Sequence, residues 1–261
     1  MREKKLNKNE MISWLRLARS SGVKFFDLLE LHGTVESALE CLSGVKIYSI
    51  NEAEQEIEKA SEAGAKIIAA CEPEFPVSLR NIVPVITVLG NTSLLNRKII
   101  AIVGNNNISD DGKKFSKELA DDLTQADFVI ASDLNITINP MIGVTVSNIG
   151  IASKDLEKIV DDGGLIVTGS PLTTTLQQQH FVQKSKIISG LSLGVIVIEA
   201  SKDSESLVTV VCTLDQKKEV FVLSGYPWNP CYSGNNSLIK NGARLIDSAD
   251  DVINTLKPMR K

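Results

Sequence analysis

The sequence predicts an α/β fold with a doubly wound, Rossmann-like and mostly parallel sheet, preceded by a small helical domain. Three observations support this prediction. From about residue 65 onward, short apolar runs alternate with helical patterns, which is the order of a parallel sheet with crossover helices. These runs are continuously apolar, so their strands should be buried on both faces. Before residue 63, apolar residues instead recur at helical spacing and glycines mark the breaks.

We therefore expect a helical domain at residues 1–62 and a Rossmann-like domain at residues 63–261. The third predicted helix of the first domain ends at Gly64, a residue type typical of a helix C-terminus. The clearest strand is the run KIIAIVG, which ends at Gly104, and a helix should follow it from Ser109. The other predicted strands lie at 65–71, at the end of the segment 75–91, and at 128–132, 144–150, 165–170, 194–200 and 219–225.

Composition narrows the function only slightly. The net charge is −4, which gives no general support to nucleic-acid binding, although cations outnumber acids between residues 163 and 245. No apolar run approaches the roughly 18 residues of a membrane span, and the charged N-terminus has no signal-type apolar stretch. We expect a cytoplasmic protein with reduced, dispersed thiols and no metal site. The four cysteines are Cys41, Cys71, Cys212 and Cys231.

Two glycine motifs invite functional interpretations. Gly104 opens the turn GNNNISDDG, which matches neither the dinucleotide fingerprint nor the P-loop, so a plain strand-to-helix turn is favoured over a nucleotide site and we expect no cofactor. The run GLSLG around Ser192 matches the nucleophile-elbow pattern, but a helix precedes it and a strand follows, the reverse of what an elbow needs. We therefore expect its glycines to end a helix and begin a strand.

Polar and cationic residues follow the later strands. Lys184 and Lys186 flank Ser185 in a segment anchored by apolar residues, and two cations at the carboxyl edge of a sheet would suit phosphate. The alternative is that they are ordinary surface lysines. A hydroxyl-rich turn with Ser204, Ser206 and Thr209 comes next, and a Gly/Asn-rich turn with Lys240 closes the series. Backbone amides, hydroxyls and cations should meet at one sheet edge.

These blocks, in this order, resemble the DNA-processing protein A family (DprA, also called Smf), the single-stranded DNA binders of bacterial transformation. The segment IISGLS, the turn SESLVT and the run SGNNSLIKNGA are similar to family motifs. The resemblance implies a SAM-like first domain, single-stranded DNA binding, loading of the RecA recombinase, a homodimer and no enzymatic activity. It implies DNA contacts at Gly104, Asn105, Asn106, Lys184, Lys186, Ser204, Ser206, Thr209 and Lys240.

The sequence also departs from the family pattern. Asn106 stands where the family has arginine, Lys184 and Lys186 replace arginines, and Glu205 replaces glycine in a turn that would face phosphate. A crossover helix between residues 132 and 144 is missing, so we expect a changed local topology or a lost strand. Because the chain ends soon after Leu256, we expect no C-terminal winged helix. These departures predict weakened DNA binding.

Two other functions stay open. One is a small-molecule, nucleotide-processing enzyme on a related Rossmann-like fold, similar to phosphoribohydrolases, although their Pro-Gly-Gly-x-Gly-Thr block is absent. The other is a folded remnant that binds no DNA.

Overall fold

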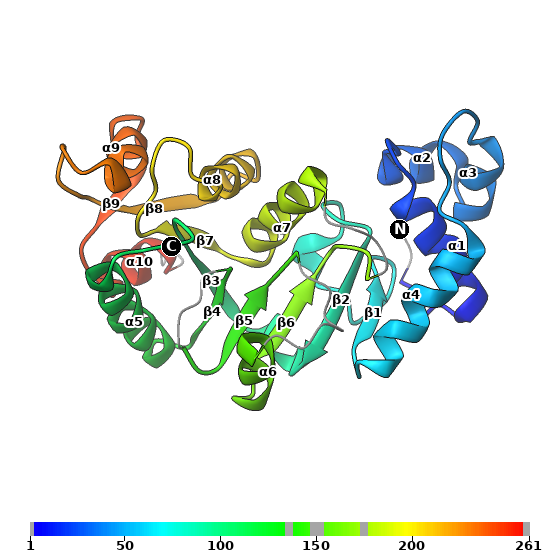
Figure 1. Cartoon of the computed structure of the whole chain (residues 1–261), viewed down its shortest axis with the longest axis horizontal. Helices are drawn as coiled ribbons and strands as arrows, with labels where there is room; N and C mark the ends of the chain where they lie inside the picture. The colour runs from blue at the N-terminus through cyan, green and yellow to red at the C-terminus, as the bar shows by residue number, and fades with distance from the viewer. Residues whose placement is uncertain (1–2, 134–137, 147–153, 173–176, 258–261) are drawn as a thin grey trace.

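The computed structural model describes residues 3–133, 138–146, 154–172 and 177–257. Its centre is a nine-stranded sheet in the order β1-β2-β6-β5-β4-β3-β7-β8-β9 (Figure 1). Strand β2 is antiparallel to both neighbours, and every other neighbouring pair is parallel. The strands are β1 (Lys66–Ala69), β2 (Val85–Gly90), β3 (Lys98–Val103), β4 (Phe128–Ser132), β5 (Met141–Val144), β6 (Leu165–Thr168), β7 (Gly194–Val197), β8 (Glu219–Leu223) and β9 (Arg244–Ile246). The predicted mostly parallel α/β fold is confirmed.

Helices cover both faces of the sheet, as the continuously apolar strands predict. In β3, Ile99, Ala101 and Val103 pack into one core, and Ile100 and Ile102 into another. Helices α7 and α8 lie on the first face, whereas α5, α6 and α10 lie on the second (Figure 1). The helices of this domain are α5 (Asp110–Gln125), α6 (Lys154–Asp161), α7 (Gln178–Leu191), α8 (Ser206–Asp215), α9 (Ser233–Lys240) and α10 (Ala249–Leu256), with short 3₁₀ turns η1 (Val77–Leu79), η2 (Thr92–Asn96) and η3 (Pro230–Tyr232).

The connection between β4 and β5 corrects the expectation of a lost strand or changed topology. The two strands are parallel neighbours, although only residues 133–140 join them. This is possible because β5 begins opposite Ile130, two residues before β4 ends, so the chain returns only about 7 Å along the strand direction. Eight residues reach at least three times that distance. The predicted strand at 144–150 was displaced: β5 ends at Val144, and residues 147–150 lie outside the described residues.

The N-terminal helices pack beside β1 and β2 and share their apolar core with the sheet domain (Figure 1). They are α1 (Lys8–Arg19), α2 (Phe25–His32), α3 (Val35–Cys41) and α4 (Ile50–Glu62). Leu15 and Leu17 are fully buried in that common core, and the indole of Trp14 donates a 2.8 Å hydrogen bond to the Pro84 carbonyl. Among the described residues, no helix combines the length and apolarity needed to cross a membrane.

A buried ion pair fixes this junction. Arg19 donates from its guanidinium to the Glu56 carboxylate at 2.8 Å and also to the Gly169 carbonyl, which lies just beyond β6. The Tyr48 hydroxyl donates to the other Glu56 oxygen at 3.1 Å. The side chains of Arg19 and Glu56 are only 3% and 0% exposed, so neither charge is solvated by water. Arg19 therefore ties α1 and α4 to the carboxyl end of β6.

We predict that Arg19→Met lowers the free energy of unfolding by about 3 kcal/mol or more, because Glu56 would remain buried without its cation. Urea unfolding followed by circular dichroism measures this. Lys24→Met is the control, because the Lys24–Asp27 pair is exposed and its loss should change stability by less than about 1 kcal/mol. Equal, small effects for the two variants would contradict the role given to Arg19.

Candidate functional site

Three turns meet at the carboxyl edge of the sheet, where β3, β7 and β8 end. The Asn105 amide of the first turn donates to the Glu199 carbonyl at 2.6 Å, and the Asn105 side-chain oxygen accepts from the Ser201 amide at 3.2 Å. The second turn joins the third because the Lys202 amide donates to the Ser233 hydroxyl at 3.2 Å. The three turns are thus joined by hydrogen bonds at one edge, as the order of the strands and turns predicted.

Glu199 is the buried carboxylate beneath these turns, with 1% of its surface exposed. It accepts hydrogen bonds from the Ser109 amide at 2.9 Å, from the Ser109 hydroxyl and from the Tyr232 hydroxyl at 3.0 Å. Burial and, next, the bond to Glu199 raise the pKa of Tyr232 to about 12, so the phenol stays a donor at neutral pH. A side chain at Gly112 would lie 2.5 Å from this carboxylate. Glu199 therefore joins the start of α5 to η3, and both of its oxygens accept hydrogen bonds.

Asn235 closes the same edge from the other side and is fully buried. Its amide nitrogen donates to the carbonyls of Ile198 and Leu223 at 2.9 and 2.8 Å, and its oxygen accepts from the Ala200 amide at 2.6 Å. The preceding residue must be glycine, since a side chain at Gly234 would lie 2.7 Å from a carbonyl oxygen. One side chain thus holds the ends of β7 and β8 against α9.

Sequence reasoning missed both Glu199 and Asn235. A signal existed for each. An acid directly after the apolar run GVIVI is out of place unless it is hydrogen-bonded, and the first of the two asparagines after Gly234 lies at a predicted helix start.

The two predicted phosphate-binding lysines lie on different sides of α7. Lys184 forms a 2.7 Å ion pair with Asp133, just after β4, and its ammonium lies 5.8 Å from the centre of the Phe181 ring. The two paired side chains are only 11% and 16% exposed. Lys186 is exposed and lines a hollow together with Arg19 and other residues of the N-terminal helices. The structure therefore brings Lys184 to the carboxyl edge, already paired, and does not bring Lys186 to the same place.

The predicted hydroxyl residues mostly contact one another. Ser204 and Ser206 share a 2.8 Å hydrogen bond at the start of α8. The Thr209 hydroxyl donates to Ser185 at 3.1 Å, and both residues are buried between α8 and α7. Thr209 thus contributes to helix packing, whereas Ser204 is partly exposed at the edge.

The remaining predicted residues differ in exposure. Gly104 is buried, and a side chain there would lie 3.0 Å from the Glu199 carbonyl oxygen. Asn105 is partly buried by its contacts with the second turn, while Asn106 and Lys240 are exposed. DNA contacts at all of these positions stay predictions.

Ser192 is the C-cap of α7, and its hydroxyl donates to the Ile188 carbonyl at 2.8 Å. A side chain at Gly190 would lie 2.4 Å from Leu79, so this glycine lets α7 approach η1. The prediction that this motif ends a helix and begins a strand is confirmed.

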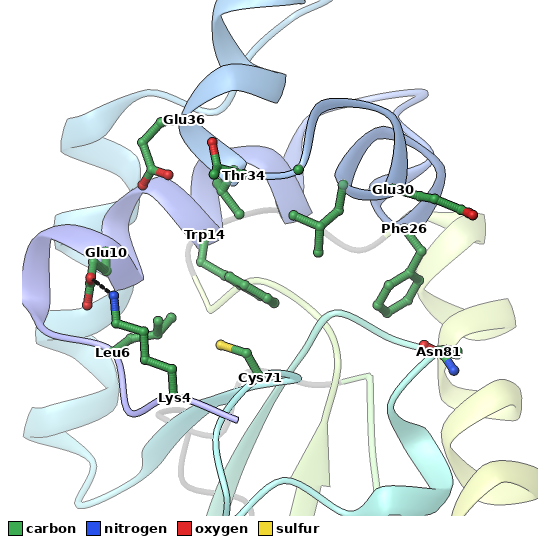
Figure 2. A pocket seen from close by; sticks show the side chains of 13 residues that line it. Lys4, Leu6, Glu10, Trp14, Phe26, Glu30, Thr34, Glu36, Cys71 and Asn81 are labelled. Carbon is green, nitrogen blue, oxygen red and sulfur yellow. Dashed lines mark hydrogen bonds and ion pairs between the residues drawn. The ribbon is translucent and has the colours of Figure 1, made fainter. Parts of the chain in front are cut away.

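A separate hollow of about 630 Å³ lies between the N-terminal helices and the segment after β1 (Figure 2). Its wall includes the apolar side chains of Trp14 and Phe26, and acids at its rim include Glu30 and Glu36. Burial raises the pKa of the Cys71 thiol to about 11, so it is not a nucleophile at neutral pH. Acids around an apolar wall do not suit phosphate. Among the described residues, no cluster of three or more His, Cys, Asp or Glu could hold a metal ion.

Comparison with known proteins shows the family to which the chain belongs. A protein-family profile described as DNA recombination-mediator protein A matches residues 66–257, and one described as the DprA-like N-terminal HHH domain matches residues 8–65. The chain belongs to the DNA recombination-mediator protein A family. DNA processing protein DprA of Bacillus subtilis is 31% identical to it over 215 residues, which is 75% of this chain and 72% of that protein.

Two solved DprA structures share the fold. The X-ray structure of DprA from Streptococcus pneumoniae aligns with a TM-score of 0.74 at 21% identity and covers 96% of this chain and 98% of that one. A structure of DprA from Helicobacter pylori, described as giving insight into its single-stranded DNA binding mode, aligns with a TM-score of 0.63 at 20% identity over 74% of this chain and 95% of that one. The DprA/Smf family is thus a family of recombination mediators with this fold.

We predict that Asn235→Ala destabilises the protein by about 3 kcal/mol, because several buried backbone groups lose their partner together. Urea unfolding measures the change. Asn241→Ala, at an exposed position after α9, is the matched control and should have almost no effect. A loss below about 1 kcal/mol for Asn235→Ala would show that α9 is held by other contacts.

A pH dependence should arise at His180, in the first turn of α7. Its Nδ1 accepts a hydrogen bond from the Gln177 amide at 3.0 Å, which requires neutral imidazole. Burial and, to a smaller extent, Arg19 lower its pKa below 6.5. Because the folded state resists protonation, this stabilisation is complete above the unfolded-state pKa near 6.5 and is lost as the pH falls below it.

His180→Gln should therefore flatten the fall in stability between about pH 7 and pH 5, since glutamine can accept the same hydrogen bond without titrating. Chemical denaturation at several pH values measures it. His32→Gln removes the chain's other histidine and should retain the wild-type slope. Identical slopes for wild type and His180→Gln would contradict the assignment.

Proposed function

We propose that this protein is a single-stranded DNA-binding recombination mediator of the DprA type, with phosphate contacts weaker than the family pattern implies. The observation that supports this most is the connected carboxyl edge, where the turns after β3, β7 and β8 are joined by Asn105, Glu199 and Ser233. Such an edge is where α/β sheets bind extended anionic ligands.

The charges at this edge support weak rather than strong binding. Lys202 is exposed there and can contact phosphate, as can the side-chain amide of Asn106, whereas Lys240 is exposed at the last residue of α9. Asp203 and Glu205 are exposed in the same turn as Lys202, and their negative charges repel phosphate. Lys184 is neutralised by Asp133.

The proposal includes a cytoplasmic location, expected from the dispersed cysteines, and a homodimer and RecA as a partner, both implied by the family resemblance. An exposed apolar stripe on α8 supports an association surface. Its members, spaced by three residues, are Val208, Val211 and Leu214, with 39%, 57% and 57% of their surface exposed.

The test is a salt titration of the protein against a fluorescent single-stranded oligonucleotide, with duplex of the same length as the control. We expect single strands to be preferred, with an affinity that falls as salt rises. Nanomolar binding at physiological salt would refute the weakened site. No binding of single strands even at low salt would refute the proposed function, and nucleotides would then be screened as ligands.

The same titration tests the Lys184–Asp133 pair. Asp133→Asn should strengthen single-strand binding and steepen the salt slope by up to about 0.7, since it frees one cation for one phosphate. Asp27→Asn removes the same charge from an exposed pair in α2 and controls for net charge. Equal effects of the two variants would show that Lys184 does not contact DNA phosphate.

A further inference from the structure

The loop between β8 and α9 carries two large aromatic side chains in water (orange in Figure 1). Tyr226 and Trp228 are 67% and 79% exposed, and their rings are stacked with centroids 5.3 Å apart and planes at 19°. The chain's other tryptophan, Trp14, is 5% exposed. Exposing an aromatic pair of this size has no structural benefit for the sheet below it, so a ligand is the natural reason for it.

The loop is held in place by its own contacts. The side-chain amide of Asn236 donates a hydrogen bond to the Gly225 carbonyl at 3.1 Å. The backbone amide of Asn229 donates to the Tyr226 carbonyl at 3.0 Å and so closes a turn. Pro227 and Pro230 restrict the backbone on either side of Trp228. The rings are therefore presented in a fixed arrangement, and little conformational entropy is lost when a ligand binds them.

The same loop is bonded to the phosphate-facing turns. Tyr232, at its end, donates to Glu199, and Ser233 accepts the amide of Lys202, whose side chain is exposed. The loop that carries the aromatic pair is thus hydrogen-bonded to the edge that carries Lys202 and Asn106. A flat apolar surface next to cations and amides matches a nucleotide that has both an unpaired base and a phosphate.

We propose that Tyr226 and Trp228 form a stacking platform for unpaired bases of a single-stranded nucleic acid, while the neighbouring turns contact its phosphates. This inference rests on the proposed function and adds to it the part of the ligand that is recognised. Stacking requires bases that are not already paired, so the platform gives a preference for single strands over duplex, and every base can stack, so it gives little sequence preference.

The experiment compares an oligothymidylate with an abasic deoxyribose-phosphate chain of the same length, using fluorescence anisotropy. For the wild type we expect weaker binding of the abasic chain. The double variant Tyr226→Ala/Trp228→Ala should lose about tenfold or more in affinity for the oligothymidylate and bind the abasic chain as the wild type does. Leu31→Ala, at a site 75% exposed in α2, is the control for removing an exposed apolar side chain.

Tryptophan emission provides a direct readout, because Trp228 is exposed and Trp14 is buried. Oligothymidylate should quench the emission of the wild type. Trp228→Phe should remove the quenching and retain most of the affinity, since phenylalanine also stacks. If the wild type binds oligothymidylate, the proposed function holds. In that case absence of quenching, or unchanged affinity of the double variant, would overturn the stacking platform alone. An equal loss on both oligonucleotides would also overturn it, and wild-type protein that binds neither chain would overturn both proposals.

Discussion

The carboxyl edge of this sheet depends on the burial of one charged group, Glu199. A carboxylate with 1% exposure is tolerated only when its oxygens are fully hydrogen-bonded, and three donors from Ser109 and Tyr232 meet that need. These donors lie far from Glu199 in sequence, so satisfying the carboxylate brings the start of α5 and the turn before α9 together over the end of β7. Asn235 adds a neutral counterpart by joining β7 to β8. The three turns are positioned because these two residues are buried.

The same arrangement limits what the edge can do. The backbone amide and the hydroxyl of Ser109 both donate hydrogen bonds to Glu199. They are therefore not available to an anion, as donors at a helix N-terminus otherwise could be. The Asn105 amide is donated to a carbonyl. The edge is thus rigid, but several of its donors serve the fold. In the proposed site, cationic side chains and exposed amides would supply the phosphate contacts, and Lys184 is already paired.

The sequence was sufficient for features set by local pattern. Continuous apolar runs identify β3, β4, β7 and β8, and the glycine at 190 marks the end of α7. Features that depend on contacts between distant segments could not be found this way. Glu199 is 90 residues from Ser109, and the short connection from β4 to β5 works only because of the register between them. The separation of Lys184 from Lys186 could have been predicted, because two residues on a helix differ in direction by about 200°.

A site with few free cations and a fixed aromatic pair shifts the source of affinity. Phosphate contacts release counterions and weaken steeply with salt, whereas stacking on Tyr226 and Trp228 does not depend on ionic strength in that way. Asn106 in place of the family's arginine and Glu205 in place of its glycine would therefore not by themselves remove single-strand binding. In the proposed site these replacements would shift the balance from charge to stacking, and the salt slope and the comparison of abasic with normal chains measure the two contributions separately.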